Sequence, residues 1–190
     1  MKRPLILVSN DDGIEARGIR LLVELMKELG DVIVVAPDGP QSGMGHAITI
    51  GNTLRLTKTD IYDDVISYKC SGTPADCVKL AKHYVLKDNK PDLVVSGINH
   101  GSNTSISVLY SGTMSAAIEA AIEGMPAIGF SLCDYDWDAD FNHTREYVLK
   151  ITRQVLKNGL PRGVALNVNF PPKRNRKTKL ERDVYDNKIC

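Results

Sequence analysis

The chain alternates short runs of apolar residues with longer segments in which apolar residues recur every three or four positions. A short continuous apolar run is typical of a buried β-strand, and the wider spacing is typical of an amphipathic helix. The predicted strands are residues 4–8, 32–36, 93–96, 127–132 and 164–170, and the predicted helices are residues 19–29, 73–85, 114–122 and 147–156. Apolar strands that alternate with helices predict an α/β fold with a doubly wound, mostly parallel sheet.

Three further segments are predicted to form a small antiparallel group of strands. They are residues 47–50, 54–57 and 65–70. Polar loops directly follow several strands of the main pattern. In doubly wound folds, ligands lie beyond the carboxyl ends of the strands, so these loops are expected to converge on one edge of the sheet. They are residues 9–13, 37–46 and 96–112.

Composition narrows the functional classes. Of the 190 residues, 43% are hydrophobic and 25% are charged, as in an ordinary globular domain. The net charge of +1 gives no electrostatic reason to bind nucleic acid or an anionic membrane. Residues 93–118 contain no Asp, Glu, Lys or Arg, but their many Gly, Ser, Asn and Thr residues exclude a membrane span. The four cysteines show no C-x-x-C spacing, which disfavours a zinc site and a disulfide framework and suits a cytoplasmic protein.

Asp11 and Asp12 are adjacent carboxylates at the end of the first predicted strand. Two such charges repel each other, so a site that keeps both ionised usually supplies a cation. Mg²⁺ and Mn²⁺ prefer oxygen ligands, and Gly13 permits a turn in which the two side chains converge. The alternative is a solvated first turn of a helix, where the helix dipole favours Asp. The adjacent pair alone leaves both interpretations open.

Asn99 and His100 lie in the polar stretch that follows the predicted strand 93–96. The amide oxygen of Asn99 is a candidate neutral ligand for the same cation, and the alternative is a turn asparagine in the left-handed region. His100 is a candidate general acid, although an isolated histidine in a loop is more often simply exposed.

Ser111, Gly112 and Thr113 directly precede the predicted helix 114–122. Hydroxyl groups and free backbone N–H groups at a helix N-terminus form an anion site suited to phosphate. The alternative is a capping serine without a ligand. Residues 71–74 have the same form, with Thr73 as the expected cap. Two such helix starts beside an acidic pair favour a phosphate bound through a metal ion.

Several common catalytic motifs are absent from the sequence. No G-x-G-x-x-G follows the first strand, and no G-x-x-x-x-G-K-[ST], G-x-S-x-G or H-E-x-x-H is present. Their absence argues against dinucleotide-binding proteins, P-loop NTPases, α/β-hydrolases and zinc hydrolases. A signalling receiver domain also opens with an acidic pair, but it needs a phospho-accepting Asp at a later strand end. The chain has Cys70 and Ser96 at those positions.

A series of short motifs, in order and at compatible spacing from about residue 4 to residue 172, resembles the SurE survival-protein nucleotidases. The motifs are residues 9–13 (SNDDG), 35–38 (VAPD) with 41–43 (QSG), 71–78 (SGTPADCV), 95–99 (VSGIN) with Gly101 and Asn103, 110–113 (YSGT) and 166–171 (LNVNFP). The resemblance implies a Rossmann-like, three-layer α/β/α fold. It also implies a metal-dependent phosphatase that acts on nucleoside 5′-monophosphates, and in some members on 3′-nucleotides and polyphosphate.

The same resemblance implies roles for individual residues. It assigns the ligands of one divalent cation, for which Mg²⁺ or Mn²⁺ is expected, to Asp11, Asp12, Ser42 and Asn99. Asp11 and Asp12 are also the candidate catalytic residues, because a carboxylate beside the cation can accept the proton of the attacking water. The resemblance assigns the phosphate contacts to Asn99, Ser111, Gly112 and Thr113. It further implies a cytoplasmic homo-oligomer, a dimer or tetramer in the full-length family, without a specific nucleic-acid or membrane partner.

Hydrolysis of nucleoside monophosphates is therefore the expected function. One alternative is a non-catalytic nucleotide or phosphate sensor that uses the same pocket. Another is a truncated product with impaired activity, because residues 1–172 form the expected phosphatase domain whereas residues 173–190 form a basic tail that does not resemble the family's continuation. Six of the ten residues from Lys173 to Arg182 are Lys or Arg, which is typical of a solvated tail.

Overall fold

One twisted sheet organises the chain, whose computed structural model describes residues 2–87, 89–136 and 138–173. Its strands are β1 (Leu5–Ser9), β2 (Asp31–Pro37), β3 (Leu56–Thr59), β4 (Ile66–Cys70), β5 (Leu93–His100), β6 (Ala127–Leu132) and β7 (Ala165–Phe170). Their order across the sheet is β3-β4-β2-β1-β5-β6-β7. Only β3 runs antiparallel to its neighbour among these strands, and the remaining pairs are parallel. The predicted mostly parallel sheet is confirmed.

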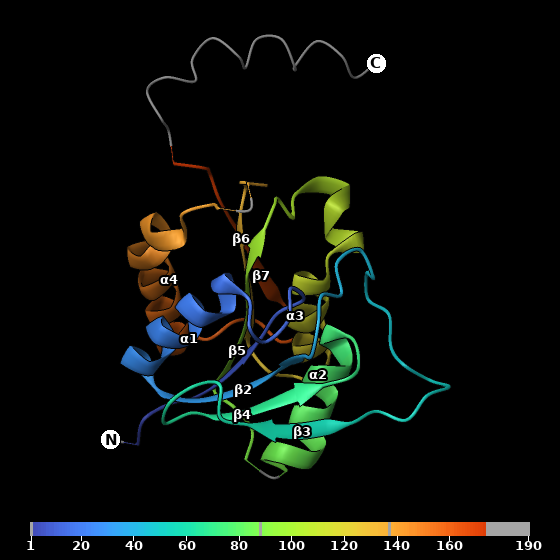
Figure 1. Cartoon of the computed structure of the whole chain (residues 1–190). Helices are drawn as coiled ribbons and strands as arrows, with labels where there is room; N and C mark the ends of the chain where they lie inside the picture. Colours follow the sequence, from blue (N-terminus) through green and yellow to red (C-terminus); the bar gives the residue numbers. More distant parts are fainter. Residues whose placement is uncertain (1, 88, 137, 174–190) are drawn as a thin grey trace.

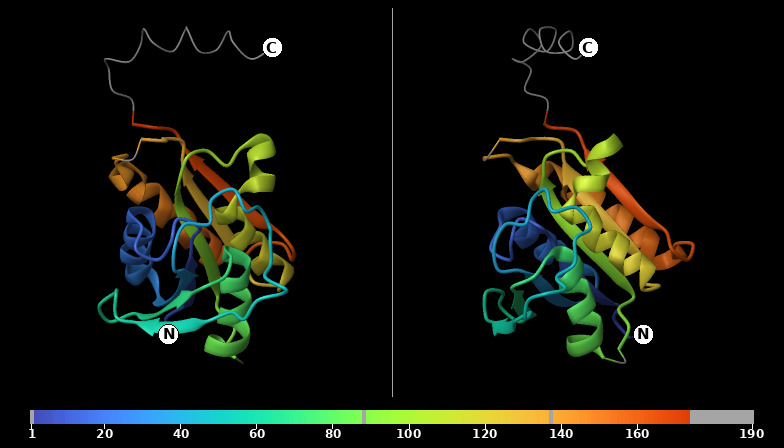
Figure 2. Two further views of the ribbon diagram at one scale, coloured as in Figure 1. Left: turned by 45° about the vertical axis from the view of Figure 1, so that its right-hand side comes forward. Right: turned by 90° about the vertical axis from the view of Figure 1, so that its right-hand side faces the viewer.

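Helices cover both faces of the sheet, which gives the three layers seen in Figure 1 and Figure 2. On one face, α1 (Arg17–Leu29) packs beside α4 (Arg145–Asn158). On the other, α2 (Pro74–Leu80) packs beside α3 (Gly112–Ile122), and α2 continues into the π-helical turn η1 (Ala81–Leu86). The short 3₁₀ turns η2 (Ser105–Tyr110) and η3 (Phe141–Thr144) lie in the connections. The α/β/α architecture predicted from the sequence is therefore present.

The central strand β1 contributes side chains to two separate cores. Ile6 and Val8 pack into the core under α1 and α4, whereas Leu7 packs into the core under α2 and α3. This division follows from the two-residue period of a strand. Each fully buried aliphatic side chain of this kind stabilises the fold by about 1.5–3 kcal/mol. The two cores fix the position of β1, and with it the carboxylate pair that follows at its end.

The order of the strands across the sheet determines where the candidate site lies. Because β2 and β5 lie on opposite sides of β1, the carboxyl end of β1 is at a topological switch point of the sheet. Connections diverge there and leave a crevice in which ligands of open α/β sheets bind. The loops after β1, β2 and β5 meet at this edge, as the sequence predicts.

The predicted helix starts are confirmed in atomic detail. The Thr73 side chain accepts a hydrogen bond from the backbone N–H of Asp76, and the Asp76 carboxylate accepts one from the backbone N–H of Thr73. This reciprocal capping box fixes the start of α2. Ser111 caps α3 by accepting from the N–H of Met114.

Three sequence predictions about local structure differ from the structure. Residues 47–50 form no strand, because the backbone groups of Ala47 and Thr49 bind side chains of α2 and its cap instead of a neighbouring strand. The loop predicted at 96–112 starts later, because β5 continues to His100, and its Asn99 pairs with Ser131 of β6 after a register shift. The strand predicted at 54–57 is displaced to 56–59.

The basic tail predicted at 173–190 lies, except for Lys173, outside the described residues. Within the described ranges, none of the helices has the length and apolar character needed to cross a membrane.

Candidate metal and phosphate site

The two adjacent carboxylates lie just beyond the last residue of β1. Asp11 is buried, with 4% of its surface exposed, and Asp12 is partly buried. Gly13 adopts a φ of +96°, which L-residues with a side chain rarely adopt, and this turn lets the chain leave the strand end directly. The turn is closed by a 2.8 Å hydrogen bond from Nδ2 of Asn10 to the carbonyl oxygen of Gly13.

Burial of both carboxylates, together with the charge of Asp12 acting on Asp11, makes this pair reluctant to ionise. Burial, followed by the charge of Asp12, raises the pKa of Asp11 from 3.8 to about 6, against hydrogen bonds from Thr113 that lower it. Burial also raises the pKa of Asp12, against a hydrogen bond from the backbone N–H of His100 that lowers it. A cation bound between the two carboxylates would offset both causes, so the electrostatics favour a metal ion here.

The N-terminus of α3 makes direct contact with Asp11. The Thr113 hydroxyl donates a 2.5 Å hydrogen bond to Oδ1 of Asp11, and the backbone N–H of Thr113 also bonds to this carboxylate. The approach is so close that a Cβ added to Gly112 would lie 2.5 Å from Cβ of Asp11. The first turn of α3 therefore lies against the carboxylate pair, as expected for a metal site and a phosphate site that share a ligand.

Asn99 and His100 reach the same edge from β5. The side-chain nitrogen of Asn99 donates to the carbonyl oxygen of Gly101 at 2.9 Å, which leaves its amide oxygen as the group available to a cation. The interpretation as a left-handed turn asparagine does not hold, because Asn99 lies within β5 and has no positive φ. The His100 ring packs edge-on against Phe141, and burial, followed by the charge of Arg17, lowers its pKa.

Ser42 is brought to the site through its neighbour in the chain. The backbone N–H of Gln41 donates a 2.7 Å hydrogen bond to the carbonyl oxygen of Asp11. Ser42 follows directly and is exposed. The structure thus brings the Ser42 loop to the carboxylate pair, while the Ser42 side chain forms no hydrogen bond with either carboxylate among the described residues.

Ser111 and Gly112 complete the predicted phosphate contacts at the start of α3. The hydroxyl oxygen of Ser111 is used as the helix cap, but its hydrogen remains available as a donor. Thr113 is engaged with Asp11 by both its hydroxyl and its backbone N–H. A phosphate at this helix end therefore shares Thr113 with the carboxylate and relies more on Ser111 and the N–H of Gly112.

The residues present fit a hard divalent cation. Two carboxylates and two neutral oxygens are the ligand types that Mg²⁺ and Mn²⁺ prefer, with water and substrate filling the remaining positions. Oδ1 of the buried Asn10, next to the pair in the chain, has no hydrogen-bond partner, so a buried polar atom is unused at the end of β1. Across the described residues there is no cluster of three or more His, Cys, Asp and Glu, which is consistent with a set containing only two carboxylates.

Sequence reasoning missed the buried carboxylate of Glu119 and its contact with His46, whose Nε2 lies 2.8 Å from Oε2 of Glu119. A signal was available. Glu119 is the one charged residue of an otherwise apolar and small-residue helix, residues 112–122. A single charge on a helix that is buried nearly all round needs partners from neighbouring elements.

Comparison with known proteins shows the family to which the chain is related. The family described as "Survival protein SurE" matches residues 6–187. The chain is 71% identical to a "5'-nucleotidase SurE" of Cytophaga hutchinsonii over 171 residues, which cover 90% of this chain and 66% of the relative. It is 66% identical to a protein of the same name from Christiangramia forsetii, over 100% of this chain and 71% of the relative. The chain thus spans about two thirds of the length of these relatives.

A solved structure has the same fold. The crystal structure of the SurE protein from Aquifex aeolicus matches with a TM-score of 0.81 and 42% sequence identity, over 93% of this chain and 69% of that chain. With a family match over nearly the whole sequence and close relatives at this level of identity, the chain belongs to the SurE family.

Proposed function

We propose that this chain hydrolyses nucleoside 5′-monophosphates to nucleoside and phosphate, with one divalent cation at the carboxylate pair. The observation that supports this most directly is the contact between Asp11 and Thr113, which joins the carboxylate pair to the N-terminus of α3. Thr113 is a predicted phosphate contact and Asp11 is a predicted cation ligand. Their contact places an anion site directly beside a cation site, which suits a phosphate ester bound through a metal ion. The relatives named 5′-nucleotidase SurE support the choice of substrate.

The cation ligands in this proposal are Asp11, Asp12, Ser42 and Asn99. When bound, Mg²⁺ or Mn²⁺ polarises the phosphoryl group and lowers the pKa of a coordinated water. The chain's own contribution is to keep both carboxylates together at the end of β1, where one of them can accept a proton from the attacking water.

The start of α3 contributes stabilisation of the phosphoryl oxygens. The Ser111 hydroxyl and the backbone N–H of Gly112 are donors that are already oriented by the helix, so they need no reorganisation as negative charge develops. In the overall reaction, a water oxygen bonds to phosphorus, the bond between phosphorus and the 5′ oxygen breaks, and the leaving oxygen takes up a proton. We extend the proposal to 3′-nucleotides and polyphosphate, to a homo-oligomer and to a cytoplasmic location on the basis of the family resemblance.

Release of phosphate from a nucleoside monophosphate, followed with and without chelator, tests the proposal. We expect EDTA to abolish release, and added Mg²⁺ or Mn²⁺ to restore it. Asp12→Asn should lower turnover by about 100-fold or more, because it removes one of two negative charges that hold the cation. Asp136→Asn is the matched control, since it removes an exposed carboxylate that follows β6 at the same edge of the sheet.

The control should retain the activity of the unmodified chain. Full activity in excess chelator contradicts the metal site. Saturable nucleotide binding without phosphate release, in the presence of either metal, identifies the sensor alternative instead.

A further inference from the structure

The loop that bears Ser42 has no regular secondary structure between the end of β2 and the start of β3. Ser42 and its two successors are exposed, so neither strand pairing nor a core holds them in place. Two backbone hydrogen bonds fix the loop near the site. They join Gln41 to Asp11 at 2.7 Å and Gly45 to Tyr110 at 3.2 Å. The segment that follows, residues 46–49, is held by side chains instead.

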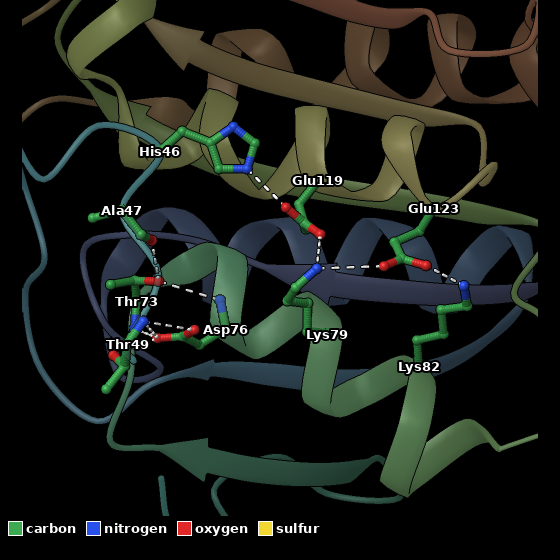
Figure 3. A network of polar contacts seen from close by, with 9 residues as sticks. All are labelled: His46, Ala47, Thr49, Thr73, Asp76, Lys79, Lys82, Glu119 and Glu123. Atoms are coloured by element: carbon green, nitrogen blue, oxygen red, sulfur yellow. Dashed lines mark hydrogen bonds and ion pairs between the residues drawn. The ribbon is translucent and has the colours of Figure 1, made fainter. Parts of the chain in front are cut away.

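The first side-chain attachment is to Asp76 at the start of α2. Its carboxylate accepts hydrogen bonds from both the backbone N–H and the hydroxyl of Thr49, the latter at 2.7 Å. The Thr73 hydroxyl donates to the carbonyl oxygen of Ala47 at 2.7 Å. Capping of α2 needs only the reciprocal bonds between Thr73 and Asp76. The additional bonds of this buried pair go to the loop, as Figure 3 shows.

The second attachment is to Glu119 in the middle of α3. Its side chain is 5% exposed and uses both oxygens, one toward Nε2 of His46 at 2.8 Å and one toward Nζ of Lys79 at 2.5 Å. Burying a carboxylate is costly unless it is paired, and Lys79 supplies a positive charge. Glu119 therefore joins the loop to α2 and α3 together (Figure 3).

The same helix that holds His46 begins with the predicted phosphate contacts. Glu119 lies about two turns after Thr113, which is bonded to Asp11. The loop is thus bonded to Asp11 itself before Ser42, and after Ser42 it is attached to α3, whose Thr113 is bonded to Asp11. Any loosening at 46–49 leaves Ser42 tethered on one side only by its neighbour Gln41 and on the other by Gly45.

We propose that Asp76 and Glu119 are positioning residues that hold segment 46–49 against α2 and α3 and thereby place Ser42 at the metal site. This inference rests on the proposed metal site for its effect on cation binding, whereas the attachment of the loop is independent of it. Neither residue is expected to touch the cation or the substrate.

Two substitutions separate this role from general stability. Thr49→Val removes the hydroxyl bond to Asp76 and leaves the Thr73–Asp76 capping box intact. Glu119→Gln leaves a single acceptor oxygen where two bonds, to His46 and Lys79, are made. Glu123→Gln is the matched control. Glu123 lies one turn further on, directly after the last residue of α3, and pairs with Lys79 and Lys82, but within the described residues it forms no hydrogen bond or ion pair with the loop.

The first measurement is hydrogen exchange of the metal-free chain. In the double variant Thr49→Val/Glu119→Gln, backbone amides of residues 42–49 should exchange about tenfold faster or more, with the central strands unchanged. Glu123→Gln should leave exchange at 42–49 as in the unmodified chain. Unchanged exchange in the double variant overturns the inference, whatever the chain does with metal or nucleotide.

The second measurement is the dissociation constant for Mn²⁺, by calorimetry without substrate. The double variant should bind Mn²⁺ about five- to tenfold more weakly, while Glu123→Gln and the conservative variant Thr49→Ser retain the original affinity. In a Ser42→Ala background the same double substitution should have no further effect, because the positioning acts through Ser42.

An equal loss of affinity in the Ser42→Ala background, or in Glu123→Gln, overturns the positioning role. Failure of the unmodified chain to bind Mn²⁺ contradicts the proposed metal site. In that case the exchange experiment alone decides whether the two carboxylates hold the loop.

Discussion

The hydroxyl of Thr113 donates a 2.5 Å hydrogen bond to Oδ1 of Asp11, across 102 positions of the chain. This bond joins the first turn of α3 to the end of β1, two elements that each belong to a predicted binding site. It also favours the ionised form of Asp11, since a hydrogen bond to a carboxylate stabilises its charge. Thr113 therefore influences cation binding through Asp11 in addition to any contact with phosphate.

Thr113→Val preserves the shape of the side chain but removes its donor, so the pKa of Asp11 should rise further above about 6. A proton then competes more strongly with the cation at mildly acid pH. We expect Mn²⁺ affinity to fall about three- to tenfold at pH 6 and much less at pH 8, where Asp11 is ionised in both proteins. Calorimetric titration at the two pH values measures the difference. A loss of equal size at both would show that the hydroxyl acts by some route other than the charge of Asp11.

The same variant tests the predicted phosphate contact. Inorganic phosphate, measured as a competitive inhibitor at pH 8, should bind more weakly to Thr113→Val if the hydroxyl is shared between Asp11 and phosphate. The melting temperature should stay close to that of the unmodified chain, so that the variant loses phosphate binding without a matching loss of thermal stability. An unchanged inhibition constant would show that Thr113 serves Asp11 and the helix start alone.

The main elements of the fold could be predicted from the sequence because their signals are local. The apolar run of β1, the periodicity of α1 and the Thr73–Asp76 capping box each involve residues close together in the chain. The predicted strand at 47–50 failed for the opposite reason. Its backbone groups bind Asp76 and Thr73, more than twenty residues away, and a short apolar segment gives no indication of such partners.

The candidate site divides in the same way. Asp11 and Asp12 could be recognised from their adjacency at a strand end, and Ser111 from its position before a helix. Ser42 had no signal of its own in a turn-rich loop, and only the family resemblance pointed to it. The bond between Thr113 and Asp11 depends on the register of β1 against β5 and on the packing of α3, which no local pattern encodes.

Asp11→Asn should stabilise the metal-free chain while it abolishes turnover. The folded-state pKa of Asp11 is about 6, above the ordinary value of 3.8, so its ionisation opposes folding above that range. The loss of folding stability caused by this ionisation is absent below about pH 4 and grows as the pH rises to 6. It levels off at about 3 kcal/mol above pH 7. Asparagine keeps an acceptor for Thr113 without the charge.

Urea unfolding in EDTA at pH 4, 6 and 7.5 measures this effect. The free energy of unfolding of Asp11→Asn should match that of the unmodified chain at pH 4 and exceed it increasingly toward pH 7.5. A variant that is less stable at pH 7.5 would contradict the destabilising charge. Added Mn²⁺ should raise the free energy of unfolding of the unmodified chain at pH 7.5, because a cation that binds only the folded chain stabilises it. The variant should gain almost nothing, because it has lost one of the two carboxylates that hold the cation.

Gly112→Ala should disturb the site although it keeps the backbone N–H that Gly112 offers to phosphate. Its Cβ would lie 2.5 Å from Cβ and 2.8 Å from Oδ2 of Asp11, so either α3 or the carboxylate must move. Overpacking of this kind costs about 1–3 kcal/mol of stability, and a shift of Asp11 away from Asp12 should lower turnover at least tenfold. Gly51→Ala is the matched control, because no atom lies within 4 Å of its added Cβ and its φ is not positive. Unfolding and phosphate release of the control should equal those of the unmodified chain. Retention of full activity by Gly112→Ala would mean that α3 can withdraw from Asp11 without consequence, and that the close contact between the helix and the carboxylate pair is not needed for hydrolysis.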